Sequence, residues 1–87
     1  MTAEEKLLAN GYEGIIYLTD FSYDTALIGV SEDGRAVYDY DLMVEWIMET
    51  QGWSYEDAVE WIDYNTARAI PYMGPEAPVI LHRFTEE

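Results

Sequence analysis

The segment TALIGVSEDGRAVYDY, residues 25–40, carries the clearest structural signal in this 87-residue chain. Its runs 25–31 and 35–40 are rich in β-branched, aliphatic and aromatic residues, which favour strands. Between them, Glu32-Asp33-Gly34 is a three-residue connection with glycine where a positive φ is needed. The segment therefore predicts a β-hairpin.

A helix is predicted immediately after the hairpin. Asp41 is placed to cap its N-terminus and Gly52 to end it, so the helix spans residues 42–51. Because apolar residues on one helical stripe pack on a core, the buried face is predicted to consist of Leu42, Met43, Trp46 and Ile47.

A second helix is predicted only a few residues further on. Ser54, with Asp57 three positions later, resembles a capping box. Apolar residues continue at helical spacing to Ala69, and Pro71 limits the length of the helix. The short gap between the two helices predicts an αα-hairpin.

Three further segments complete the predicted fold. Residues 2–10 are typical of a short helix capped by Thr2, residues 14–19 of a buried strand, and residues 79–84 of a last strand that returns to the hairpin. The predicted order is α-β-β-β-α-α-β. It describes a single acidic α+β domain, residues 1–87, with a small mainly antiparallel sheet of three to four strands and the αα-hairpin packed on one face.

The composition predicts a folded, cytoplasmic protein. A hydrophobic fraction of 49% and an aromatic fraction of 15% argue against intrinsic disorder. The absence of cysteine excludes a disulfide framework and a thiolate zinc site. No apolar run approaches the roughly 20 residues of a membrane span, and the acidic N-terminal residues do not fit a secretory signal.

The charge is the most unusual property of the chain. Asp and Glu number 18 against 4 Lys and Arg, which gives a formal net charge of −14. Such a charge makes the compact state repel itself, and a basic partner, bound cations or solubility would explain it. Direct binding to nucleic acid or to an anionic membrane is disfavoured, because those surfaces require an excess of Lys and Arg.

Two rows of carboxylates recur at helical spacing: Asp41, Glu45 and Glu49 in the first predicted helix, and Glu56, Glu60 and Asp63 in the second. Like charges at i,i+4 destabilise a helix by roughly 0.2–0.5 kcal/mol per pair. Neighbouring charges in a row stand about 6 Å apart, and Asp39 and Asp41 stand roughly 6.6 Å apart along a strand. Because these intervals resemble those of a phosphate backbone, we expect the acids to crowd on one exposed side.

Tyrosine accompanies the acids. Four tyrosines are adjacent to an aspartate, in Tyr23-Asp24, Tyr38-Asp39, Tyr40-Asp41 and Asp63-Tyr64. Tyrosine suits interfaces because it buries a ring and keeps a hydrogen-bonding tip. We expect Tyr23, Tyr40 and Tyr64 to act as aromatic anchors, whereas Tyr38 fits the interior of the sheet.

Catalysis and metal binding have weaker support. Residues 20–24 have the opening spacing of a calcium loop, but Thr25 and Ser31 occupy positions that require Gly and Glu. Asp39 and Asp41 leave a metal-dependent hydrolase open as a third hypothesis. His82 is the only histidine and belongs to no recognisable nucleophile motif. We expect no enzyme activity, no cofactor and no specific metal.

Residues 22–29, 38–41 and 54–66 resemble a group of small acidic proteins encoded by bacteria and their phages or mobile elements. The resemblance covers most of residues 14–72, and that group has no established activity to carry over. In size and charge, though not in any motif, the chain is also similar to phage anti-CRISPR proteins, which occupy the DNA-binding cleft of an effector nuclease.

Two functions from different classes follow. The first is a non-enzymatic, nucleic-acid-mimicking inhibitor that occupies a basic nucleic-acid-binding surface of a partner protein. Its predicted contact residues are Asp39, Asp41, Glu45, Glu49, Glu56, Glu60 and Asp63, with Tyr23, Tyr40 and Tyr64 as anchors. The alternative is a structural or oligomerising accessory domain whose acidity serves solubility.

Overall fold

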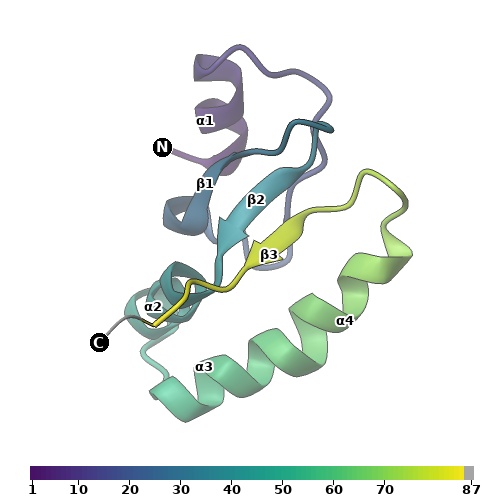
Figure 1. The fold of residues 1–87 in the computed structure, drawn as a ribbon. Coiled ribbons are helices and arrows are strands. Elements are labelled where there is room, and N and C mark those ends of the chain that lie inside the picture. The colour runs from purple at the N-terminus through teal and green to yellow at the C-terminus, as the bar shows by residue number, and fades with distance from the viewer. Residues whose placement is uncertain (86–87) are drawn as a thin grey trace.

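The computed structural model describes residues 1–85 and has an α+β fold with a three-stranded mixed sheet. The strands are β1 (Leu27–Val30), β2 (Ala36–Asp39) and β3 (Val79–Leu81), in the spatial order β1-β2-β3. Figure 1 shows α1 (Ala3–Ala9) beside β1 and the other helices at the opposite end of the molecule. α2 (Tyr40–Gln51) follows β2 directly, without an intervening loop.

α3 (Tyr55–Trp61) starts a nearly continuous helix that Figure 1 shows running beneath the sheet. It continues through a π-helical turn, η2 (Ile62–Thr66), into α4 (Ala67–Ala69), and ends in the 3₁₀ turn η3 (Ile70–Tyr72). The π-helical turn adds one residue to the local helical repeat and changes the direction in which the following side chains point.

The predicted hairpin is confirmed. β1 and β2 are antiparallel, and Gly34 in the connection has a φ of +82°. The strands are shorter than predicted at both outer ends, because the 3₁₀ turn η1 (Asp24–Ala26) precedes β1 and Tyr40 already begins α2. The register shifts between Leu27 and Gly29, which marks a bulge in β1.

The prediction of a strand at residues 14–19 is wrong. This segment has no strand partner; it is fixed by side-chain contacts, including a 3.0 Å hydrogen bond from the amide of Leu18 to the hydroxyl of Tyr38. β propensity forms a strand only where another strand offers hydrogen bonds, and α1 lies beside the outer edge of β1. The observed order is therefore α-β-β-α-α-β.

The prediction of a mainly antiparallel sheet is only half right, because β3 pairs with β2 in parallel. A parallel partner needs a long crossover, and α2 through η3 provide it. β3 is also shorter than the predicted strand 79–84. Its last pair is Asp39 with Leu81, and the residues beyond lie outside the sheet.

Helix caps agree with the sequence except at α2. Thr2 and Glu5 form a complete capping box, Ser54 caps α3, and Gly52 ends α2 with a φ of +70°. The predicted cap Asp41 is wrong: Asp39 caps α2, its Oδ1 accepting a 3.0 Å hydrogen bond from the amide of Leu42. The helix thus begins two residues earlier than predicted, because β2 ends at Asp39 and the buried carboxylate of Asp39 caps the helix.

The core joins the sheet to α2 and α3. Met43 and Ile47 from the predicted stripe are fully buried, while Leu42 and Trp46 are half-buried around them. An aromatic cluster fills the space between α2 and α3: Phe21 lies 5.6 Å from Trp46, 5.8 Å from Trp53 and 5.0 Å from Trp61, as distances between ring centroids.

Candidate partner-binding surface

All four cationic side chains contact other groups of the same chain. Lys6 Nζ donates to the carbonyls of Asp24 and Leu27 at 2.8 and 2.9 Å, and Arg35 Nε donates to the carbonyl of Ala77 at 2.7 Å. The guanidinium of Arg68 lies 4.7 Å from the centre of the Tyr64 ring. Only Arg83 forms ion pairs with carboxylates in the described part of the chain.

The ion pairs of Arg83 involve two of the predicted contact residues. Its Nε lies 2.8 Å from Asp39 Oδ2, and its Nη2 lies 3.4 Å from Asp41 Oδ2. Asp39 is only 4% exposed, so burial removes it from the predicted surface. Asp41 remains exposed, but its charge is partly neutralised by the same guanidinium.

The remaining predicted acids lie at the surface. Glu45 and Glu49 are exposed on α2, and Glu56 and Glu60 are exposed on α3. Asp63, on the π-helical turn, is also exposed and accepts a 3.3 Å hydrogen bond from the hydroxyl of Tyr40. None of these five carboxylates is ion-paired within residues 1–85.

The three predicted tyrosine anchors have different environments. Tyr23 is fully buried with its hydroxyl 2.6 Å from Thr66 Oγ1, so it is not available as a surface anchor. Burial raises the pKa of its phenol. Tyr40 is half-buried, with its ring centre 4.6 Å from that of His82. Tyr64 is 59% exposed, the most exposed of the three, with the guanidinium of Arg68 over its ring.

Tyr40 is held in a polar and acidic environment. The pKa of the Tyr40 phenol is raised to about 12. Burial is the largest cause, followed by the negative charge of Asp63 and the hydrogen bond to it. The Tyr40 hydroxyl therefore remains protonated at neutral pH and donates a hydrogen bond to Asp63 Oδ1. Tyr40 thus contacts Asp63 through its hydroxyl, while its ring packs against His82.

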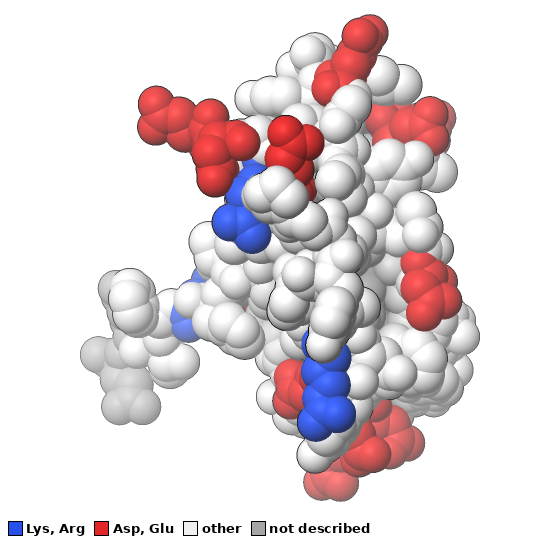
Figure 2. Space-filling view, turned by 90° about the vertical axis from the view of Figure 1, so that its right-hand side faces the viewer, with Lys and Arg blue, Asp and Glu red and all other residues white. Residues whose placement is uncertain are grey.

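The acids are less concentrated than the sequence suggested. Figure 2 shows the carboxylates of one face in several separate groups, with uncharged surface between them and cations beside some of them. The expectation of one crowded acidic side is therefore not met on this face. On this face negative charge is divided among several groups, so recognition of a specific partner needs a more defined feature.

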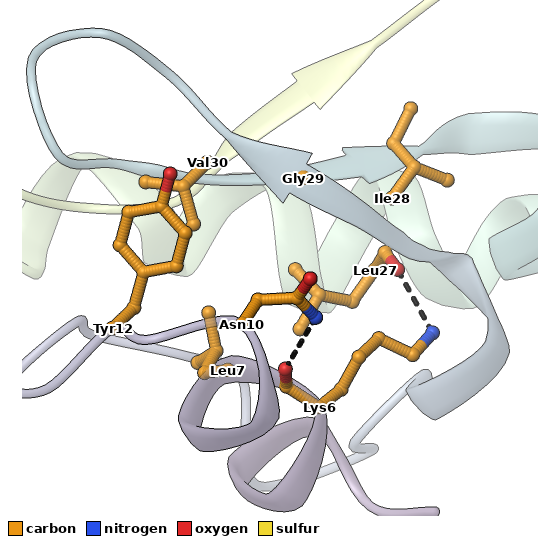
Figure 3. A pocket seen from close by; sticks show the side chains of 8 residues that line it. All are labelled: Lys6, Leu7, Asn10, Tyr12, Leu27, Ile28, Gly29 and Val30. Carbon is orange, nitrogen blue, oxygen red and sulfur yellow. Dashed lines mark hydrogen bonds between the residues drawn. The ribbon is translucent and has the colours of Figure 1, made fainter.

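One such feature is an apolar groove of about 230 Å³ between α1 and β1 (Figure 3). Leu7 and Leu27 face each other across it, Tyr12 lies opposite Val30, and Ile28 points away. Two of its polar side chains are already engaged: Lys6 Nζ as described above, and Asn10 Nδ2 with the carbonyl of Lys6 at 2.8 Å. The groove offers apolar contact.

A second groove, of about 190 Å³, follows α3 and the π-helical turn. It is lined by Trp53, Asp57, Glu60, Trp61, Tyr64 and Asn65. Sequence reasoning named only Glu60 and Tyr64 as contact residues. The missing signal was the spacing of four between Asp57, Trp61 and Asn65, which follow one face of the helix, while Trp53 precedes the cap Ser54.

Neither a metal site nor a membrane segment is found in the described part of the chain. Residues 1–85 contain no group of three or more His, Asp or Glu side chains arranged to hold a metal ion. Within the same residues, no helix has the length and apolar character that crossing a bilayer requires. The Asp39 and Asp41 carboxylates of the metal-dependent hydrolase hypothesis are instead bridged by Arg83.

No known protein family, curated protein or solved structure matches the chain. The features of the protein that bear on its function are the charge, the two grooves and the exposed aromatic side chains.

Proposed function

We propose that this protein is a non-enzymatic inhibitor that binds a basic, nucleic-acid-binding surface of a partner protein and thereby excludes the nucleic acid. One observation carries the proposal: each of the four cations contacts a group of the same chain, and Asp39 and Asp41 are the only ion-paired acids among residues 1–85. The uncompensated negative charge has no use in folding, because like charges destabilise the compact state.

The mechanism is occupancy. The long-range field of a chain with a net charge of −14 attracts a basic surface and speeds association, particularly at low salt. The contact residues that remain at the surface are Asp41, Glu45, Glu49, Glu56, Glu60 and Asp63, with Tyr64 as aromatic anchor. Asp39 and Tyr23 are buried and Tyr40 is half-buried, so these three support the fold. This mode of action is that of the anti-CRISPR proteins which the chain resembles in size and charge, and it suits a cytoplasmic partner.

The experiment compares two variants of equal net charge. The first, Glu45→Gln/Glu49→Gln/Glu60→Gln, removes helix charges in the proposed contact set. The control, Glu13→Gln/Glu32→Gln/Glu76→Gln, removes exposed charges elsewhere. Each immobilised protein captures proteins from nuclease-treated bacterial lysate, and each captured protein is purified and tested for release of a fluorescent oligonucleotide by the free chain.

The proposal expects capture of a nucleic-acid-binding protein and stoichiometric release of its oligonucleotide. Release should weaken from about 50 mM to about 200 mM NaCl, because screening weakens contacts between charges. The helix variant should lose most of the activity and the control should keep it. Captured proteins that bind no nucleic acid, or equal activity of the two variants, would overturn the proposal.

A second candidate function, a self-associating accessory domain, is favoured by an exposed apolar side chain of the sheet. Ile28 on β1 is 52% exposed, and an apolar side chain at this position can pack against a second copy of the chain. Sedimentation velocity from micromolar to millimolar protein tests this function. It predicts a dimer that the substitution Ile28→Lys abolishes, whereas a monomer at every concentration would exclude it.

A further inference from the structure

The groove along α3 and the π-helical turn has aromatic walls. The ring centres of Trp53 and Trp61 are 5.6 Å apart and the ring planes are inclined by 67°, so the two indoles form a corner. Tyr64 also lines the groove, one turn further along the helix. Because Trp53, Trp61 and Tyr64 all line the groove, parts of three aromatic rings border one small volume, and aromatic π surfaces attract organic cations.

The aromatic corner is supported from inside the protein. Phe21 packs against both indoles, with ring centres 5.8 Å from Trp53 and 5.0 Å from Trp61, and Tyr23 is fully buried behind Phe21 at 6.1 Å. Both tryptophans are half-buried rather than free at the surface. A rigid corner costs little conformational entropy when a ligand binds, so the groove is preorganised.

The polar residues of the groove have one sign of charge. Asp57 and Glu60 line it, both are exposed, and neither is ion-paired within residues 1–85. The side-chain amide of Asn65 donates a 3.2 Å hydrogen bond to the carbonyl of Trp61. The groove therefore combines two carboxylates with aromatic faces and excludes anions such as phosphates.

We propose that this groove binds the guanidinium of a single arginine side chain of the partner. A volume of about 190 Å³ is below the roughly 300–1,000 Å³ of sites that enclose whole small molecules, but it suits the end of one side chain. Arginine fits better than lysine because its planar guanidinium both stacks on aromatic rings and forms paired hydrogen bonds to a carboxylate.

The protein contains an internal example of the same contact. The guanidinium of Arg68 stacks on the ring of Tyr64 at 4.7 Å, next to the groove. The inference deepens the proposed function, on which it rests for the identity of the partner: an arginine of the basic surface would enter this groove while the surrounding acids provide long-range attraction.

The test uses argininamide as the probe and the intrinsic fluorescence of the tryptophans as the signal. Two of the three tryptophans line the groove, so occupancy changes the emission. The titration is performed on the whole chain at constant ionic strength, with lysinamide as the comparison ligand. The test variant is Glu60→Gln/Tyr64→Leu, which alters two exposed side chains of the groove, and the control is Glu32→Gln in the turn between β1 and β2.

The expected result is a saturable change with argininamide that is weaker with lysinamide. The affinity should fall by about tenfold in Glu60→Gln/Tyr64→Leu, since a carboxylate contact and a cation–π contact are both removed. Glu32→Gln should change it by less than about twofold. A circular dichroism spectrum equal to that of the unmodified chain shows that the variant is folded; if it is not folded, Glu60→Gln alone takes its place.

Two outcomes overturn the inference: a linear, non-saturable change that is equal in the variants, or equal affinity for lysinamide and argininamide. Neither outcome depends on a partner protein, so the arginine groove and the inhibitor function can be refuted independently of each other. A chain that binds argininamide but releases no nucleic acid from any captured protein would refute the inhibitor function alone. A chain that releases nucleic acid but does not bind argininamide would refute the arginine groove alone.

Discussion

Arg83 Nε lies 2.8 Å from Oδ2 of Asp39, a carboxylate that is only 4% exposed and also caps α2. The pair connects the segment after β3 to the junction of β2 and α2, 44 residues earlier in the chain. Figure 1 shows this last segment turning back toward α2. One buried carboxylate thus joins the sheet, the helix cap and the C-terminal segment.

The substitution Arg83→Met should destabilise the protein by about 1–2 kcal/mol, because it leaves the buried charge of Asp39 without its cation. The half-exposed position of Arg83 keeps the loss below that of a fully buried pair. Urea denaturation measures the change. Arg68→Met is the control and should cost less than about 0.5 kcal/mol, since Arg68 is exposed and forms no ion pair within residues 1–85. Equal losses of stability in the two variants would show that the ion pair between Arg83 and Asp39 contributes no more than the contacts of the exposed Arg68.

The two aspartates at the start of α2, Asp39 and Asp41, should differ sharply in how much each contributes to the free energy of unfolding. Asp39→Ala removes both the cap of the helix and the partner of Arg83 and should cost about 2–3 kcal/mol. Asp41→Ala removes only an exposed contact at 3.4 Å and should cost at most about 0.5 kcal/mol. Thermal and urea unfolding of the two variants give the comparison. A larger loss for Asp41→Ala would contradict the assignment of Asp39 as the cap.

Salt should stabilise the protein. Because most acids have no internal cation, screening relieves more repulsion than it removes attraction. We expect the free energy of unfolding to rise by about 1 kcal/mol from low salt to about 0.15 M NaCl, which is roughly 4–8 °C in the melting temperature. The variant Glu13→Gln/Glu32→Gln/Glu76→Gln should show a smaller rise. A stability that falls with salt would mean that attractive ion pairs dominate.

Stability should decline at alkaline pH because of two tyrosines. Burial raises the pKa of Tyr38 to about 12, and burial together with Asp63 raises that of Tyr40 to about 12. An unfolded tyrosine titrates near 10, so between about pH 10 and 12 the native state holds more protons and the unfolded state gains stability as pH rises. The contribution is complete below about pH 10. Urea midpoints across this range should fall, and less steeply for Tyr40→Phe. An equal slope in Tyr40→Phe would show that Tyr40 does not contribute.

Local features of the fold were predictable because neighbouring residues determine them. The hairpin depends on Gly34 and the strand propensities beside it, and the caps at Thr2 and Ser54 depend on residues within one turn. The exposed positions of Glu45, Glu49, Glu56 and Glu60 likewise follow from helical periodicity. The failure at residues 14–19 has the opposite cause, since a strand requires a partner that propensity does not supply.

The sequence by itself determined the hairpin, the two helices that follow it and the large excess of negative charge. Only the tertiary structure decided which acids are free, because Arg83 reaches Asp39 and Asp41 from a distant part of the chain. It also decided that Tyr23 is buried, and that Phe21 supports the corner of Trp53 and Trp61. Such contacts depend on how separate elements pack in space, and a pattern along one element contains no information about its neighbour.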